Sequence, residues 1–187
     1  MQKIIIFLTV VCLFISGISL AVTIDWVTVG NPGNAGEQSR LDYDDPTYYG
    51  GVDYVYQIGK YEITAGQYCE FLNAVATDPY SELHGVYNAN TMGDYGCKIQ
   101  QSFDGANYTY SVASEWANRP VNYVNWYCCL RFCNWLHNGQ PTGVQDASTT
   151  EDGAYDMSLG AGVVRKPGAR VWLPSENEWY KAAYHKN

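Results

Sequence analysis

The chain has 187 residues, of which 47% are hydrophobic and 16% charged, and its formal net charge is −8 at pH 7. This length suffices for one domain with a real core, and the composition is not that of a disordered chain. The net negative charge argues against nucleic acids and anionic membrane surfaces as partners, because both are bound mainly through clustered Lys and Arg.

Residues 1–21 have the pattern of a signal peptide. Lys3 supplies a basic n-region, Ile4 to Ile18 is an apolar run, and Ser19-Leu20-Ala21 is a small-x-small cleavage site. A membrane anchor is the competing interpretation, but the run is short for a span of about 20 apolar residues. We expect a bacterial-type exported protein, secreted or held in the periplasm or cell envelope, with no stable membrane anchor after cleavage. The mature domain, 22–187, keeps 10 basic and 19 acidic residues.

Two strands and a helix are predicted in the first part of the mature chain. Residues 23–30 alternate in the manner of a strand, and residues 52–58 alternate as a half-buried strand. Thr64 then opens a helix through a capping box with Gln67. The residues expected on its buried face follow at i, i+3, i+4 and i+7, namely Tyr68, Phe71, Leu72 and Val75.

Two irregular stretches flank this helix. Residues 37–51 are polar, and their acidic group, Asp42, Asp44 and Asp45, fits a solvated loop better than a calcium site, because its spacing matches no EF-hand. Residues 78–110 are predicted to be a surface excursion with one or two short strands, the last over 108–112. Asn107 begins a formal N-glycosylation tripeptide, and His84 reads as an ordinary turn histidine.

The central stretch, Arg119 to Gly139, predicts a strand followed at once by a helix. The period changes from two, over residues 121–125, to nearly four. Asn125 is a suitable N-cap and Gly139 a suitable stop. The stripe predicted to be apolar and buried consists of Trp126, Cys129, Leu130, Cys133 and Leu136.

The last part of the chain predicts a long loop and a third helix. Residues 138–170 form the loop, in which Glu151, Asp152 and Asp156 make a weak acidic signal for a metal. Ser175 and Glu178 form a second capping box. The apolar side of this helix is expected to be Trp179, Ala182 and Ala183, and we expect apolar surface of this kind to be covered in a longer domain.

The residues alone reveal no reaction. The three histidines, at 84, 137 and 185, have no nucleophile-elbow or papain-type context. Cys129 and Cys133 share a helical face, but a closed zinc site needs four ligands, so buried structural thiols are favoured. Catalytic residues, cofactor-binding residues and metal ligands are therefore all predicted to be none. The mature chain keeps an odd number of cysteines, which leaves at least one thiol without a partner among Cys69, Cys97, Cys128, Cys129 and Cys133.

Three blocks together resemble the formylglycine-generating enzyme family, also called sulfatase-modifying factor domains. The blocks are Tyr56 to Val75 (YQIGKYEITAGQYCEFLNAV), Arg119 to Gly139 (RPVNYVNWYCCLRFCNWLHNG) and Arg170 to Ala183 (RVWLPSENEWYKAA). The last block is similar to the family's R-L-P-T-E-A-E-W-E-Y run, with Val171-Trp172 inserted.

The resemblance implies an α+β, C-type-lectin-like fold with much irregular loop, truncated here at its C-terminus. Members of the named type oxidise a cysteine of an exported sulfatase to formylglycine, using copper held by two cysteines and molecular oxygen; structural calcium is also implied. Those two cysteines lie C-terminal to the third block, so no residue here inherits a catalytic role. Cys133 matches a helix cysteine that forms a disulfide in some members, whereas the position of a second such cysteine holds Ala183.

Three functions remain open at this stage. The first is an exported oxidase-family domain without the copper-binding segment, acting on an exported protein or peptide. The second is a non-catalytic binding module on the same scaffold, whose Tyr and Trp residues recognise a glycan or a peptide. The third is a family member with non-haem iron chemistry, which would need histidine ligands that this stretch does not show.

Overall fold

The protein is described here from a computed structural model that covers residues 21–38, 47–81 and 84–185. The expected signal peptide, apart from Ala21, and the acidic group of residues 42–45 lie outside these residues. The elements are short helices and two-stranded sheets, so the α+β class is confirmed. In the described part of the chain, no helix is both long and apolar enough to cross a membrane.

Three antiparallel pairs of strands make up the sheets. β1 (Trp26–Val29) pairs with β4 (Tyr56–Gly59), β2 (Glu37–Gln38) with β3 (Tyr48–Tyr49), and β5 (Ile99–Phe103) with β6 (Tyr108–Val112). The prediction for 108–112 is confirmed. The strand predicted from Val52 begins only at Tyr56, because the Val52 carbonyl accepts from the backbone N–H of Gly33 and from Lys181 Nζ instead of a neighbouring strand.

Helix α1 (Ala65–Val75) begins as its sequence predicts. Thr64 Oγ1 accepts from the backbone N–H of Gln67, and Gln67 Oε1 accepts from the backbone N–H of Thr64, so the capping box is complete. Its predicted face is buried and forms the centre of the larger core together with Ile99 of β5 and the rings of Tyr110, Phe132 and Trp135.

The strand predicted before the central helix is wrong. The N–H of Val121 donates to Ile63 O beside an isolated bridge between Thr64 and Pro120, and Asn125 O accepts from the N–H of Cys129 in the following helix. Tyr123 has φ 56°, a left-handed conformation that ends any extended run. A one-turn helix that the sequence did not predict, α2 (Ser114–Ala117), lies just upstream.

Helix α3 (Trp126–His137) has the predicted boundaries, with Asn125 as N-cap and Gly139 at φ 85° beyond its end. The buried residues of α3 do not form the single predicted stripe, because the helix packs against a different core on each of two sides. Phe132 and Trp135 join the larger core, while Leu130 and Cys133 join a smaller one that includes Ala154, Tyr155, Met157 and Val163. Trp126, expected in the stripe, is 46% exposed.

Helix α4 (Glu176–Tyr184) corrects the prediction for the third helix. Its capping box is present, but Trp179 is 53% exposed and Ala182 and Ala183 are exposed, whereas Glu178 and Lys181 are each 1% exposed. The helix thus buries its charged side, because partners for both charges lie in the surrounding loops.

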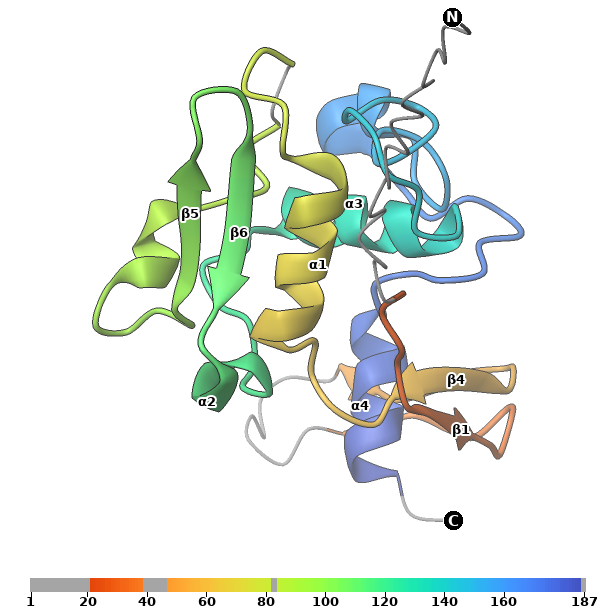
Figure 1. Cartoon of the computed structure of the whole chain (residues 1–187). Coiled ribbons are helices and arrows are strands. Elements are labelled where there is room, and N and C mark those ends of the chain that lie inside the picture. The colour runs from red at the N-terminus through yellow and green to blue at the C-terminus, as the bar shows by residue number, and fades with distance from the viewer. Residues whose placement is uncertain (1–20, 39–46, 82–83, 186–187) are drawn as a thin grey trace, which may run out of the picture.

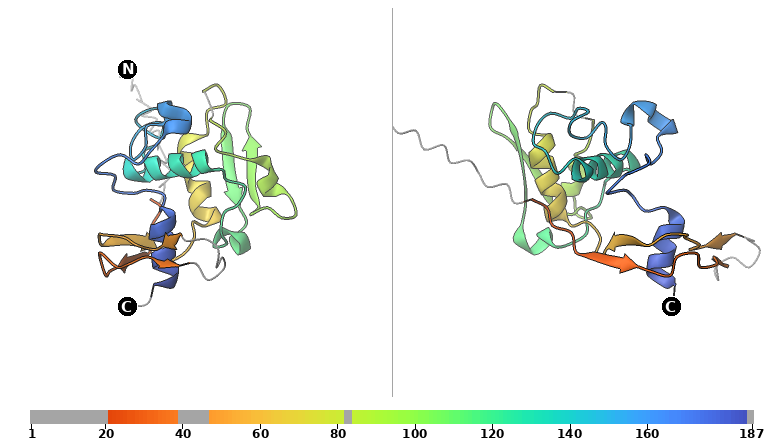
Figure 2. Two further views of the ribbon diagram at one scale, coloured as in Figure 1. Left: turned by 180° about the vertical axis from the view of Figure 1, so that it is seen from behind. Right: turned by 90° about the vertical axis from the view of Figure 1, so that its right-hand side faces the viewer.

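The elements gather at two ends of the molecule. Figure 1 shows α1 and α3 beside the β5–β6 hairpin at one end, and α4 beside β1 and β4 at the other. The views in Figure 2 show the same separation from behind and from the side. Two 3-10 elements, η1 (Ala89–Met92) and η2 (Met157–Gly162, kinked at Gly160), lie in the connecting loops.

Candidate functional site

The cysteines, the residue type with most chemical interest here, are free and shielded. In the described residues, Cys69, Cys97, Cys128 and Cys133 are buried thiols and Cys129 is half-buried. Burial, with a contribution from Cys129, raises the pKa of the Cys133 thiol to about 12. Burial and Cys128 also raise the pKa of Cys129. These two thiols are therefore protonated near neutral pH, as expected for structural cysteines.

The copper site implied by the resemblance does not fit these thiols. Copper is held by thiolates, and the raised pKa values of Cys129 and Cys133 disfavour the thiolate. Across residues 21–38, 47–81 and 84–185, no group of three or more His, Cys, Asp and Glu side chains is placed to hold a metal ion. We assign no metal-dependent step to them.

Glu178 is the centre of a polar cluster beside α4 in the described chain. Its carboxylate accepts hydrogen bonds from Tyr54 Oη at 2.5 Å, Arg165 Nη1 at 2.8 Å and the indole N–H of Trp172 at 3.1 Å. It also accepts from the backbone N–H of Ser175 at 2.7 Å, within the capping box. Burial raises the pKa of this carboxyl, but the hydrogen bonds outweigh burial and the net pKa is lowered.

The Glu178 cluster extends to the β1–β4 strand pair beside α4. The Tyr56 hydroxyl donates to the backbone carbonyl of Glu178, and Arg165 Nη2 lies 3.0 Å from Tyr54 Oη. Burial and the Glu178 charge raise the pKa of Tyr56 to about 12. The phenol therefore stays protonated and donates. This arrangement anchors α4 to the first block of the resemblance and keeps the Glu178 carboxylate buried.

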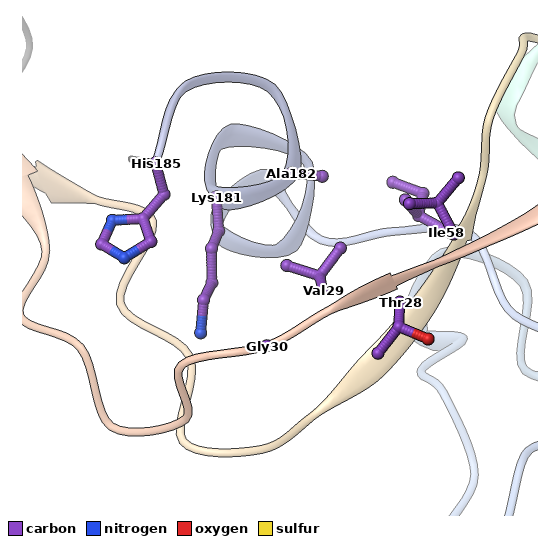
Figure 3. Close-up of a pocket in the computed structure, with 8 residues that line it drawn as sticks. Thr28, Val29, Gly30, Ile58, Lys181, Ala182 and His185 are labelled. Atoms are coloured by element: carbon purple, nitrogen blue, oxygen red, sulfur yellow. The ribbon is translucent and has the colours of Figure 1, made fainter. Parts of the chain in front are cut away.

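A small pocket lies between α4 and β1–β4 (Figure 3). It has a volume of about 190 Å³, and Lys181 and His185 form its polar side, with Val29 and Ile58 among its apolar walls. Lys181 Nζ donates to Asn31 O at 2.7 Å and Val52 O at 3.2 Å, so its charge is already held by the protein. The volume is below the roughly 300 Å³ at which small-molecule sites begin.

Ion pairs hold the loop after α3 in place. They account for the acidic residues that gave a weak signal for a metal site in the sequence. Arg131 binds Glu151 with both nitrogens, at 2.7 and 2.8 Å, and His84 Nε2 lies 3.6 Å from Glu151. Asp152 pairs with Lys166. Asp156 caps η2 by accepting from the backbone N–H of Ser158. These carboxylates are thus occupied by protein partners.

Asn134 is the polar residue that sequence reasoning missed most completely. It is fully buried on α3, where its amide donates to Thr150 O at 2.8 Å and Tyr155 O at 2.9 Å and accepts from the backbone N–H of Tyr155 at 2.8 Å. The only available signal was an Asn between apolar neighbours in a helix.

The three blocks of the resemblance are brought together by these contacts. Tyr54 and Tyr56 meet Glu178, α1 packs against α3 through Phe71 and Phe132, and Asn134 holds the segment whose Tyr155 hydroxyl accepts from the backbone N–H of Leu173.

Comparisons with known proteins agree with this assembly of blocks. The family model described as "Sulfatase-modifying factor enzyme 1-like domain" matches residues 33–186, well over half of the chain. Comparison with the curated proteins and with the solved structures gave no match. The matched range includes all three blocks, α1, α3 and α4. The chain therefore belongs to the family of sulfatase-modifying factor enzyme 1-like domains.

Proposed function

We propose that the chain is an exported sulfatase-modifying-factor-like domain with a C-type-lectin-like arrangement, and that it does not generate formylglycine by itself. The observation that carries the second part is the environment of the α3 thiols. Cys133 lies in the smaller core with a raised pKa, which favours a packing role over a ligand role.

Two features of the sequence support this proposal. The signal-peptide pattern of residues 1–21 supports export. The family's two copper-binding cysteines lie C-terminal to the third block, and residues 134–187 contain no cysteine.

An oxidation assay tests the catalytic part. The purified chain is supplied with copper, oxygen, a reductant and a sulfatase-derived peptide that contains the target cysteine, and aldehyde is measured by mass spectrometry. We expect no aldehyde above a control that contains copper but no protein. Copper-dependent aldehyde formation by the chain alone would overturn the proposal.

A second candidate function is a non-catalytic binding module that recognises a glycan or an exported peptide. A run of aromatic rings on α4 and β3 favours it. Trp179 lies 5.8 Å from Tyr184, Tyr184 lies 5.1 Å from Tyr180, and Tyr180 stacks on Tyr49 at 5.7 Å between ring centroids. Trp179 and Tyr184 are both more than half exposed, and flat apolar faces of this kind suit sugar rings and extended peptides.

Titration of the chain with oligosaccharides and with exported peptides tests this candidate. Trp179→Ala should weaken binding at least tenfold if the run is the binding surface. Trp126→Ala, which removes a tryptophan of similar exposure (46% against 53%) from α3, is the matched control and should have no effect. An equal loss in both variants would argue against the α4 surface.

A further inference from the structure

Hydrogen bonds align α1 with β6. The Asn73 side chain accepts from the backbone N–H of Tyr110 at 2.9 Å and donates to its carbonyl at 2.8 Å. Near the end of the helix, Thr77 O accepts from the backbone N–H of Tyr108 at 2.7 Å. The helix and the strand therefore run in opposite directions, as Figure 1 also shows.

This alignment places Cys69 near the end of β6. Cys69 precedes Asn73 by four residues, about 6 Å along a helix. Val112 follows Tyr110 by two residues, about 6.6 Å along a strand. Cys69 thus lies at the level of Val112.

The paired strand β5 begins at this level, and Cys97 lies just before it in the sequence. Val112 pairs with Ile99 of β5, and Cys97 precedes Ile99 by two residues. Cys69, Cys97 and Ile99 are 5%, 2% and 0% exposed and belong to the same core cluster. Asn122 Oδ1 accepts from the backbone N–H of Cys97 at 2.9 Å, which fixes this part of the chain.

The five thiols divide into two groups by their electrostatic contacts. Burial, Glu70 and Cys97 raise the pKa of Cys69 to about 11, against a lowering effect of Asn73. Cys97 is the one cysteine that contributes to this shift. The α3 thiols instead influence one another, since Cys128 acts on Cys129 and Cys129 acts on Cys133.

We propose that Cys69 and Cys97 form a disulfide in the exported protein, which joins α1 to the start of β5. The proposal rests on the export part of the proposed function, because disulfides persist in oxidising compartments. The bond would leave three unpaired thiols in the mature chain, those of Cys128, Cys129 and Cys133, and all three lie on α3.

The bond would form by thiol–disulfide exchange with an oxidised dithiol protein or a small-molecule disulfide. One thiolate attacks the oxidant's disulfide, forming a mixed disulfide and releasing one oxidant thiol. The second cysteine, as its thiolate, attacks the protein sulfur of the mixed disulfide and displaces the other oxidant thiol. The two cysteines lose two protons and two electrons, and the oxidant's disulfide gains both. Because the folded Cys69 thiol is buried with a raised pKa, exchange precedes the packing of α1.

The bond would secure the surface excursion between the two positions. This excursion carries Tyr80 and Tyr95, which are 84% and 87% exposed, and η1. A covalent link at its base would stabilise the folded excursion that carries these rings, mainly by lowering the conformational entropy of the unfolded chain.

Peptide mapping tests the proposal directly. The reduced, unfolded chain is refolded in a glutathione redox buffer, free thiols are alkylated in denaturant without reductant, and the protein is digested with trypsin. The peptide Tyr61–Lys98 has no internal Lys or Arg and contains both cysteines. We expect it to be unlabelled and lighter by two hydrogen atoms than its reduced form, and to take two labels only after reduction. Labelling of both Cys69 and Cys97 after refolding would overturn the proposal.

The digest contains its own control. Cys128 and Cys129 lie in Ile99–Arg131, and Cys133 lies in Phe132–Arg165, so labels on α3 are scored separately. The same mapping of protein produced from the complete chain in cells with an oxidising periplasm tests export. A bond that forms in the redox buffer and is absent from the cellular product contradicts export and leaves the pairing supported.

Stability measurements separate the bond from burial. Reductant should lower the denaturation midpoint of the oxidised wild type and leave that of a Cys69→Ala/Cys97→Ala variant unchanged. Cys128→Ala/Cys129→Ala is the matched control and should respond to reductant like the wild type. A wild type whose midpoint does not change with reductant would count against the bond.

Discussion

Arg165 and Glu178 form an ion pair, with 2.8 Å between Nη1 and Oε1, in which the carboxylate is almost fully buried and the guanidinium is partly exposed. The same guanidinium lies over the ring of Trp172, 4.8 Å from its centroid, and Trp172 donates its indole N–H to Glu178. The pair therefore joins the loop before α4 to α4 itself, and Tyr54 extends the link to the residues just before the first block.

We predict that Glu178→Gln destabilises the protein by about 2–4 kcal/mol. The amide keeps the size of the carboxylate but puts an NH₂ group among donors from Arg165, Trp172 and Ser175, so a buried donor is left without an acceptor. The free energy of unfolding, from urea denaturation, measures the effect. Glu176→Gln removes an exposed charge from the same helix turn and should cost no more than about 1 kcal/mol. Equal effects of the two substitutions would contradict this role.

The pH dependence of stability should also show the contribution of the ionised Glu178 carboxylate. Because its folded-state pKa is lowered from the usual 4.5, its contribution is present above the unfolded pKa and is lost as the pH falls through the folded pKa. The difference in melting temperature between wild type and Glu178→Gln should be constant from about pH 7 to about pH 5 and shrink below that. A difference that grows on acidification would mean that the carboxyl is stabilised in its protonated form.

Local signals predicted where three of the helices begin. Thr64, Asn125 and Ser175 all act as N-caps, because capping depends on residues within one turn of the helix start. The hairpin strand over 108–112 was also predicted correctly from its neighbouring turn residues. These elements were predictable because the residues that define them are neighbours in the sequence.

The burial of α4 was not predictable in the same way. Hydrophobicity favoured Trp179 and the two alanines as the inner side, but Glu178 and Lys181 are inside, because Arg165 and the carbonyls of Asn31 and Val52 compensate their charges. Those partners lie up to 150 residues away in the sequence. The Val121–Asn125 strand failed for a related reason, since its backbone partners are set by tertiary contacts and Tyr123 adopts a left-handed conformation.

We predict that Asn134→Ala destabilises the protein by about 2–4 kcal/mol. The substitution leaves the carbonyls of Thr150 and Tyr155 and the N–H of Tyr155 without their partner inside the structure. Thermal or urea denaturation measures the loss. Asn107→Ala, at an exposed turn, is the matched control and should change stability by no more than about 0.5 kcal/mol. A loss below about 1 kcal/mol at Asn134 would show that water replaces these hydrogen bonds without cost.

Gly96→Ala should be among the most damaging small substitutions. A Cβ at Gly96 would lie 2.0 Å from the carbonyl oxygen of Thr91, which accepts from the backbone N–H of Lys98 at 2.7 Å. Because the clash is with backbone, the turn between η1 and β5 must move, and we expect a loss of about 2 kcal/mol or more. Gly30→Ala is the matched control, since a Cβ there meets nothing within 4 Å. If both variants unfold at the wild-type midpoint, the turn relaxes freely and does not constrain β5; if Gly96→Ala alone is destabilised, the close approach of Gly96 to Thr91 is required for the start of β5.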